Sequence, residues 1–200
     1  EKNKELTETK AKFQGMLDST LSLLTIRDTI TYEDVNYHEN FINNIFDIAM
    51  KIFPEIEYGS CAIHSSKEVK VLSVKGYNLD FFKSLKIPTN KYNYTLYTPS
   101  FSKDPMKDFK DALGDRYPLF KDDLPKVKES VRILIKLGDG YNGIILFDIH
   151  EKSDEAFTEN DINNIGAFQN LINSFYEMNK LAINNNNLKD DIVLRQNRTI

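Results

Sequence analysis

The most constraining stretch of this sequence is residues 131–149. It consists of two β-branched and apolar runs on either side of a Gly-Asp-Gly turn at 138–140, a pattern typical of a β-hairpin. The second run, residues 144–149, is almost continuously apolar, and such a strand is usually covered on both faces. We therefore expect this hairpin to lie in the middle of a sheet.

The composition favours one domain and argues against several kinds of partner. Two hundred residues with 40% hydrophobic content predict one globular domain with an extension. The net charge is −4 and no basic stripe is present, so we expect no nucleic-acid partner. No apolar run reaches the length of a membrane span, so we expect no membrane contact within this segment. The single cysteine, Cys61, cannot form an internal disulfide, and we expect a cytoplasmic setting.

The N-terminal residues predict a helix that needs a partner. Within residues 4–26, apolar side chains recur at steps of three and four, namely at Leu6, Phe13, Leu17, Leu21 and Leu24. Such a stripe packs either on the domain itself or on the same helix of a second subunit. We expect a homodimer that forms through the terminal helices.

The next elements follow in a regular order. Residues 37–53 predict a helix that Pro54 ends. Residues 58–65 and 68–75 predict two strands, and Asn78 is a suitable cap for a short helix up to residue 85.

Residues 87–127 are the least regular part. Three tyrosines that alternate with other residues predict an edge strand, namely Tyr92, Tyr94 and Tyr97. Asp104 and Pro105 are suited to open a helix, which Gly114 ends. The remainder, up to residue 127, contains two prolines and is expected to be irregular or briefly helical.

The final helix begins after a polar loop. Thr158 or Asn160 is suited to cap it, and its apolar stripe runs from Phe168 through residue 182 and beyond the asparagine run at 184–187. Asn185 falls on that stripe. It either fixes the register of a coiled coil or marks a point where the helix frays.

The order of these elements and several local motifs resemble those of GAF domains. The run Tyr-Asn-Gly-Ile-Ile-Leu-Phe at 141–147 resembles the family's last core strand, and Phe-Thr-Glu-Asn-Asp at 157–161 resembles its entry to the final helix. Gly-Ser at 59–60 and Lys-Gly-Tyr at 75–77 resemble its early motifs. The resemblance covers about residues 36–182, and Leu134 departs from it because many members have proline there.

The resemblance implies an α+β fold of GAF/PAS type with a central antiparallel sheet of five to six strands. Helices of both termini would pack on one face, and the variable segment 87–127 would cover the other, with a ligand pocket beneath it. The chain then divides into an N-terminal signalling helix and connection (1–35), a GAF-like domain (36–182) and an exit helix (183–200) toward a C-terminal effector.

Residues that carry chemistry in some GAF domains are largely missing here. The cyclic-nucleotide signature is matched at Phe157 and Asp161, but Ile162 replaces its glutamate. Bilin-binding members attach the chromophore through a cysteine near the variable segment, which has none. Metal-ligand spacing is absent from the three histidines, His38, His64 and His150. We expect no catalytic residue, no metal site and no enzymatic activity, and the sequence leaves the cofactor unknown.

Strand alternation identifies candidate pocket residues. One face of the first hairpin strand carries Arg132, Leu134 and Lys136, and the opposite face carries Val131, Ile133 and Ile135. If the second set faces the helices, Arg132 and Lys136 face the pocket or solvent, and the variable segment adds Tyr117 and Phe120. Arg132 is then a candidate for binding an anionic small molecule. The alternative is an edge-strand arginine in water.

These observations favour a non-catalytic sensor and dimerisation module of a larger bacterial signalling protein, in which binding of an unidentified small molecule changes helix packing. The resemblance implies a diguanylate cyclase, a phosphodiesterase or a kinase as the effector. The chain begins at residue 1 without methionine and ends in a helical pattern, so we interpret it as a piece of a longer protein. Two alternatives stay open: a ligand-free structural dimerisation domain, and an extracytoplasmic PAS-like sensor of a membrane receptor.

Overall fold

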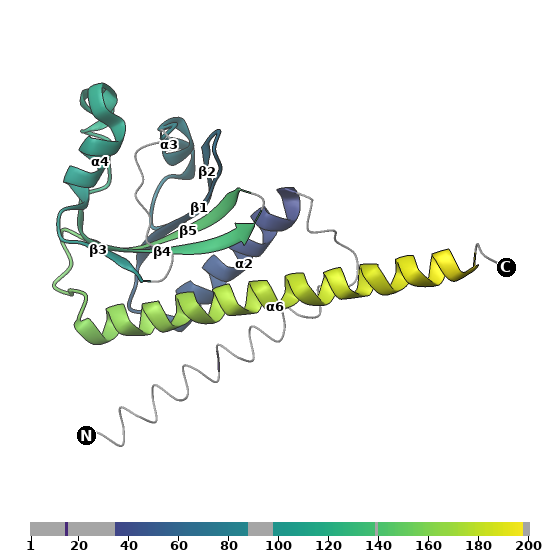
Figure 1. The fold of residues 1–200 in the computed structure, drawn as a ribbon. Coiled ribbons are helices and arrows are strands. Elements are labelled where there is room, and N and C mark those ends of the chain that lie inside the picture. The colour runs from purple at the N-terminus through teal and green to yellow at the C-terminus, as the bar shows by residue number, and fades with distance from the viewer. Residues whose placement is uncertain (1–14, 16–34, 88–97, 139, 198–200) are drawn as a thin grey trace, which may run out of the picture.

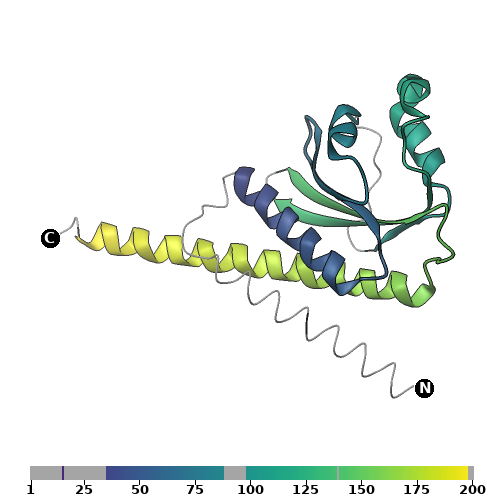
Figure 2. The same cartoon turned by 180° about the vertical axis from the view of Figure 1, so that it is seen from behind.

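A five-stranded antiparallel sheet with helices on both faces forms the protein (Figure 1). The computed structural model describes residues 15, 35–87, 98–138 and 140–197. The strands are β1 (Tyr58–His64), β2 (Val69–Lys75), β3 (Ser100–Ser102), β4 (Val127–Gly138) and β5 (Tyr141–His150). One face carries α2 (Val35–Ile52) and α6 (Glu159–Asn197), and the other carries α3 (Leu79–Ser84), α4 (Pro105–Leu113), the 3-10 turn η2 (Gly114–Arg116) and α5 (Tyr117–Phe120) (Figures 1 and 2).

The hairpin lies in the middle of the sheet, as predicted. The strand order is β2-β1-β5-β4-β3, and the β4–β5 register pairs Ile133 with Ile145. β4 begins at Val127, before the predicted start, because its first residues pair with the end of β5, Val127 opposite His150. The sheet therefore shows the predicted α+β architecture with five strands.

Helix α2 packs closely on the sheet because β5 has a glycine beneath it. A Cβ atom at Gly143 would lie 2.1 Å from Cδ1 of Ile42 on α2. Ile42 and its neighbours Ile45 and Ala49 are fully buried. These apolar side chains form the face of α2 that packs on the sheet.

Thr158 caps the final helix. Its Oγ1 accepts a hydrogen bond from the Asp161 N–H at 3.2 Å, and its own N–H donates to Asp161 Oδ2 at 2.9 Å. This reciprocal pair is the arrangement of a capping box. From there α6 continues as one helix through the asparagine run to Asn197, and the side chains at 182–197 lie outside the described residues.

The variable segment differs from its prediction in one element. The Asp104 Oδ1 accepts from the Lys107 N–H at 3.1 Å, which confirms the predicted cap of α4. The strand that pairs with β4 on the side away from β5 is the three-residue β3. The predicted strand at Tyr92, Tyr94 and Tyr97 lies outside the described residues, as does the predicted helix at 4–26 except for Gly15, which is helical.

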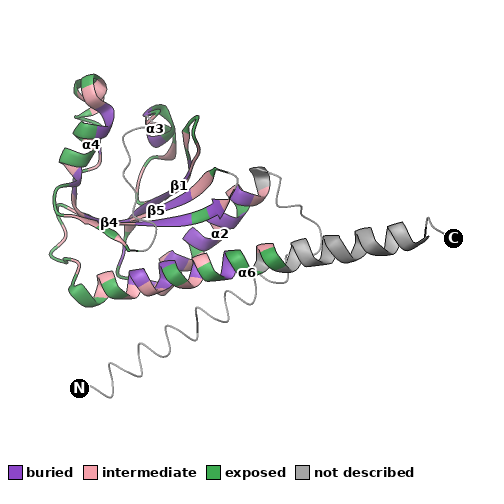
Figure 3. Ribbon diagram, in the orientation of Figure 1, coloured by how far each residue is buried: buried purple, intermediate pink, exposed green. Residues whose placement is uncertain are grey.

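The buried apolar side chains form two groups, one on each face of the sheet. Figure 3 colours the ribbon by burial. The helix-facing cluster comprises Phe41, Ile42, Ile45, Phe46, Ala49, Phe53, Ile56, Cys61, Ile63, Val131, Ile133, Ile135, Leu137, Ile145, Phe147, Ile165, Phe168, Ile172, Phe175 and Tyr176. The cavity-facing cluster comprises Ala62, Val71, Phe82, Leu85, Leu113, Leu124, Leu134 and Ile144. Val131, Ile133 and Ile135 therefore face the helices, as predicted.

Side chains of α6 complete the edge of β4. The pairing with β3 ends at Arg132. Beyond it, the Leu134 carbonyl accepts hydrogen bonds from Gln169 Nε2 at 3.0 Å and Asn173 Nδ2 at 3.2 Å. The Lys136 N–H donates to Asn173 Oδ1 at 2.9 Å. The Asn173 amide thus takes the place of a neighbouring strand, and backbone groups at a sheet edge otherwise stay exposed.

Among the residues that the structure describes, no helix combines the length and the apolar character that crossing a membrane requires.

Candidate functional site

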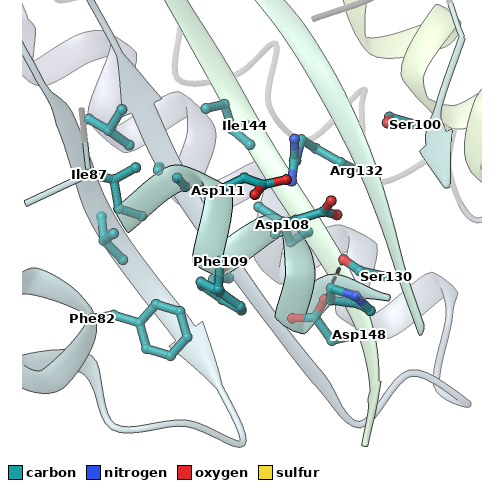
Figure 4. Close-up of a pocket in the computed structure, with 17 residues that line it drawn as sticks. Phe82, Ile87, Ser100, Asp108, Phe109, Asp111, Ser130, Arg132, Ile144 and Asp148 are labelled. Atoms are coloured by element: carbon teal, nitrogen blue, oxygen red, sulfur yellow. Dashed lines mark hydrogen bonds between the residues drawn. The ribbon is translucent and has the colours of Figure 1, made fainter. Parts of the chain in front are cut away.

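A cavity of about 290 Å³ lies between the sheet and the helices of the variable segment. Figure 4 shows it with α4 on one side and the strands on the other. The lining residues are Ser60, Ala62, Val69, Val71, Phe82, Ile87, Ser100, Pro105, Asp108, Phe109, Asp111, Ala112, Ser130, Arg132, Ile144, Leu146 and Asp148. This volume is at the lower end of the range for small-molecule pockets.

Most of the lining is apolar. Ala62, Val71 and Ile144 come from three strands of the sheet, and Phe82 and Phe109 come from α3 and α4. Arg116 holds these two covering helices together, because its Nη2 donates to the carbonyls of residues 85 and 86 after α3, each at 2.8 Å. The two helices that cover the cavity are therefore held together by a residue that does not line it.

A buried carboxylate lies on the sheet side of the cavity. Asp148 on β5 is only 5% exposed, and it accepts hydrogen bonds from Ser130 Oγ at 2.6 Å and from the Tyr77 hydroxyl at 3.2 Å. Burial raises the pKa of Asp148 to about 6, although these hydrogen bonds and the charge of Arg132 act in the opposite direction. Burial and the Asp148 charge also raise the pKa of Tyr77. Asp148 is therefore mostly ionised at neutral pH, and it loses its charge at a higher pH than an exposed aspartate does.

Two more carboxylates come from α4. Asp108 and Asp111 are exposed residues of that helix and both line the cavity. In Figure 4 the carboxylate of Asp111 and the guanidinium of Arg132 point toward one another. The lining thus combines an apolar wall with one cation and three carboxylates.

The structure brings one of the four predicted pocket residues into the lining. Arg132 lines the cavity. Tyr117 and Phe120 pack against the cavity-facing cluster but do not line the cavity. Lys136 is exposed, and its backbone binds α6. Whether Arg132 binds a ligand stays a prediction.

Sequence reasoning missed the carboxylates. Asp148 is the only charged residue in the apolar run 144–149, and strand alternation places it on the same face as Ile144 and Leu146. That signal was available. Asp108 and Asp111 gave none, because acidic residues on a short helix are ordinarily solvated.

The single cysteine lies away from the cavity. Cys61 belongs to the helix-facing cluster, and its Sγ contacts Asn43 Oδ1 at 3.6 Å. Burial raises the pKa of its thiol to about 12, so the reactive thiolate is scarce at neutral pH. Within the described ranges, no three or more His, Cys, Asp or Glu side chains gather as a metal site would require.

A second, shallower groove beside α3 is lined mainly by aromatic residues. Tyr58 lies between Tyr77 and His150, with ring centroids 5.3 and 5.2 Å apart, and Tyr77 in turn stacks on Phe82 at 5.2 Å. These ring contacts pack β1, β5 and α3 against one another.

Comparison with known proteins identifies the fold. No protein-family model and no curated protein sequence matches this chain. Solved structures with a similar fold include two that contain GAF domains. The GAF domain of a protein assigned as a sensor histidine kinase, from Pseudomonas syringae pv. tomato, has a TM-score of 0.53 and 12% identity, covering 98% of this chain and 99% of that one. The GAF domain/HD domain protein from Geobacter sulfurreducens has a TM-score of 0.52 and 11% identity, covering 72% and 94%.

Proposed function

We propose that this chain, which has the fold of a GAF domain, is a non-catalytic sensor module of a larger signalling protein. A small organic molecule would bind in the cavity, and the change would reach an effector through α6. The observation that carries this proposal is the double role of Leu134. Its side chain belongs to the cavity-facing cluster, while its carbonyl holds two side chains of α6.

The route from cavity to helix is short. Arg132 lines the cavity two residues before Leu134 on the same strand, and Gln169 and Asn173 then connect that strand to α6. A ligand that displaces this part of β4 therefore changes the hydrogen bonds that position the helix. For the ligand to shift the balance between two helix positions, it must bind one of them more tightly.

The lining favours binding over catalysis. It contains no histidine, cysteine or lysine. Ser130 Oγ donates to Asp148, but a carboxylate with a pKa of about 6 is a weak base for a serine hydroxyl. Residues suited to activating a nucleophile are therefore missing from the described lining.

An open cavity supports a sensor over a ligand-free structural domain. In the structural alternative, the aromatic residues of the variable segment fill the pocket themselves. Tyr117 and Phe120 pack beside it and Phe109 forms part of its wall, and the described lining leaves about 290 Å³. Tyr92, Tyr94 and Tyr97 lie outside the described residues.

A thermal-shift screen of small organic metabolites tests the ligand-binding function. The variant Ala62→Leu places extra side-chain volume in the cavity, and Lys67→Leu adds a leucine at an exposed turn as a control. A ligand at a hundred times its Kd should raise the Tm of the wild type and the control by about 5 °C or more, and should leave Ala62→Leu unchanged. Equal shifts in all three proteins would place binding outside the cavity, and no shift from a broad set would support the structural alternative.

We also propose that the terminal helices pair in a homodimer, with residues 1–35 and 183–200 leading into and out of the domain 36–182 in a cytoplasmic protein. Two apolar side chains on α6 support a contact there, because Met178 is 62% and Leu181 is 61% exposed. Light scattering on the chain carrying Met178→Glu and Leu181→Glu should show a monomer. Leu119→Glu, at a residue 74% exposed on α5, should stay dimeric. A wild-type monomer, or a dimer in every variant, contradicts this pairing.

A further inference from the structure

We propose that the cavity binds a small organic cation, namely a protonated amine with a short apolar body. The inference rests on the proposed sensor function and specifies its ligand. The cation would lie on the Asp148 side of the cavity, and the apolar body would lie against the wall formed by the sheet and α3.

The first argument for a cation is the net charge of the lining. Three carboxylates line the cavity, Asp108, Asp111 and Asp148, against one cation, Arg132. The side chains of Asp111 and Arg132 point toward one another (Figure 4), so their charges largely offset each other. Asp108 and Asp148 then leave the lining with an excess of negative charge. An anion that approached Arg132 would enter a site where carboxylates outnumber the arginine, and a cation finds the complementary field.

The position of Asp148 carries the second step. A carboxylate in the middle of a sheet costs stability when it is ionised, because burial disfavours the charged form. Ser130 and Tyr77 give it hydrogen bonds but no positive charge, and Arg132, the one cation of the described lining that acts on it, also faces Asp111. An ammonium group beside Asp148 would supply that charge together with hydrogen-bond donors, and charge-assisted hydrogen bonds are about twice as strong as neutral ones.

The apolar wall carries the third step and excludes a bare metal ion. Val71, Phe82, Phe109 and Ile144 surround the space next to the polar residues. A small inorganic cation makes no use of such a surface, whereas an alkyl or aryl group buries apolar area against it. The lining therefore fits a ligand with one charged end and one apolar end.

If the ligand is a cation, its affinity decreases as the pH falls, whereas the affinity of an anion would increase. The groups that act on Asp148 are Ser130, Tyr77 and Arg132, and Asp108 lies in the same lining. Since the pKa of Asp148 is raised to about 6, about one tenth of the free protein is ionised there at pH 5. A ligand that requires the carboxylate then binds about tenfold more weakly at pH 5 than at pH 7.5. A carboxylate ligand would bind more tightly at pH 5.

The test uses sets of probes with the same body and different charge. One set is 2-phenylethylamine, 2-phenylethanol and 3-phenylpropionate; a second is isoamylamine, isoamyl alcohol and 4-methylpentanoate. Isothermal titration on the whole chain at pH 7.5 and pH 5 should show an amine binding at least tenfold more tightly than its alcohol or carboxylate, with affinity falling about tenfold at pH 5. Asp148→Asn should weaken amine binding at pH 7.5 and remove the pH dependence. Asp154→Asn, at an exposed loop residue, should bind like the wild type.

The outcomes separate this inference from the proposed function. An alcohol or carboxylate that binds as tightly as its amine, and loses affinity in Ala62→Leu, overturns the cation assignment and leaves the sensor function standing. Wild-type protein that binds no member of either set, and no compound of the metabolite screen, overturns both. If Asp148→Asn does not unfold cooperatively, Asp108→Asn at an exposed lining residue replaces it. An unchanged preference for the amine in that variant contradicts the charge argument.

Discussion

The two faces of the sheet are built differently. Among the described residues, the helix-facing cluster contains twenty buried apolar side chains, and the cavity-facing cluster contains eight. The helix face buries long aliphatic and aromatic residues against α2 and α6. The cavity face carries Asp148, Arg132 and an open space. From this difference we expect the helix face to contribute more of the free energy of folding, and the cavity face to tolerate polar groups that a tightly packed core would not.

Adjacent residues on β5 give the largest test of this comparison. Phe147 is fully buried on the helix face, with its ring centroid 5.7 Å from that of Phe53, whereas Leu146 is half-buried in the cavity lining. We expect Phe147→Ala to lower the free energy of unfolding by about 4 kcal/mol and Leu146→Ala by about 1 kcal/mol. Urea denaturation measures both. Equal losses would mean that the two faces contribute alike.

The charge on the cavity face should be visible in the pH dependence of stability. Because the pKa of Asp148 is raised from 3.8 to about 6 in the folded protein, the folded state holds this proton up to a higher pH than the unfolded state. The stabilisation that Asp148 contributes to the folded state is fully present below pH 4, decreases as the pH rises toward 6 and is constant at higher pH. The decrease amounts to about 3 kcal/mol.

Subtracting the unfolding free energy of Asp148→Asn at each pH isolates this contribution, since the other titrating groups are common to both proteins. We expect the difference between wild type and variant to change by about 2 kcal/mol between pH 4 and pH 7. A constant difference would show that Asp148 titrates in the folded protein as it does in water.

The close approach of α2 to β5 gives a smaller effect on the helix face. In Gly143→Ala the new methyl group meets Ile42, and we expect a loss of about 2 kcal/mol in denaturant unfolding. Shortening the opposing side chain with Ile42→Ala in the same chain should make the alanine at 143 nearly neutral relative to Ile42→Ala alone. Additive losses would indicate that the glycine matters for another reason.

The smallest expected effect concerns the link between the faces. Asn173→Ala removes hydrogen bonds to the Leu134 carbonyl and the Lys136 N–H, at a cost of about 1 kcal/mol. The control is Asn170→Ala, at an exposed residue of the same helix. Hydrogen exchange at the Lys136 amide should become faster in Asn173→Ala and stay unchanged in Asn170→Ala. Unchanged exchange in both would remove the amide bridge from the proposed route.

The fold was predictable where local patterns and packing agree. The hairpin, the cap of α4 and the packing side of Val131 all follow from alternation or capping residues. The three-residue β3 was not predictable, because Ser-Phe-Ser is too short to show a period and forms only against β4. Such a short edge strand forms only through tertiary pairing, which no local sequence pattern predicts.

The site was predictable in part. Alternation identified Arg132, and the same rule applied to β5 would have identified Asp148. It did not identify Asp108 and Asp111, because their position over the cavity depends on how α4 lies against the sheet. The same alternation grouped Lys136 with Arg132, yet Lys136 pairs with Asn142 near the turn and lies outside the lining.

The amide of Asn173 also fixes the point on α6 about which the helix would tilt. Helix α6 continues from that residue to Asn197 and runs well past the sheet (Figure 1), a length of roughly 36 Å at the usual rise of an α-helix. Over such an arm, a tilt of about 5° at the pivot displaces the far end by about 3 Å. In the proposed sensor, a movement at β4 too small to disturb the helix-facing cluster would thereby be enlarged along α6.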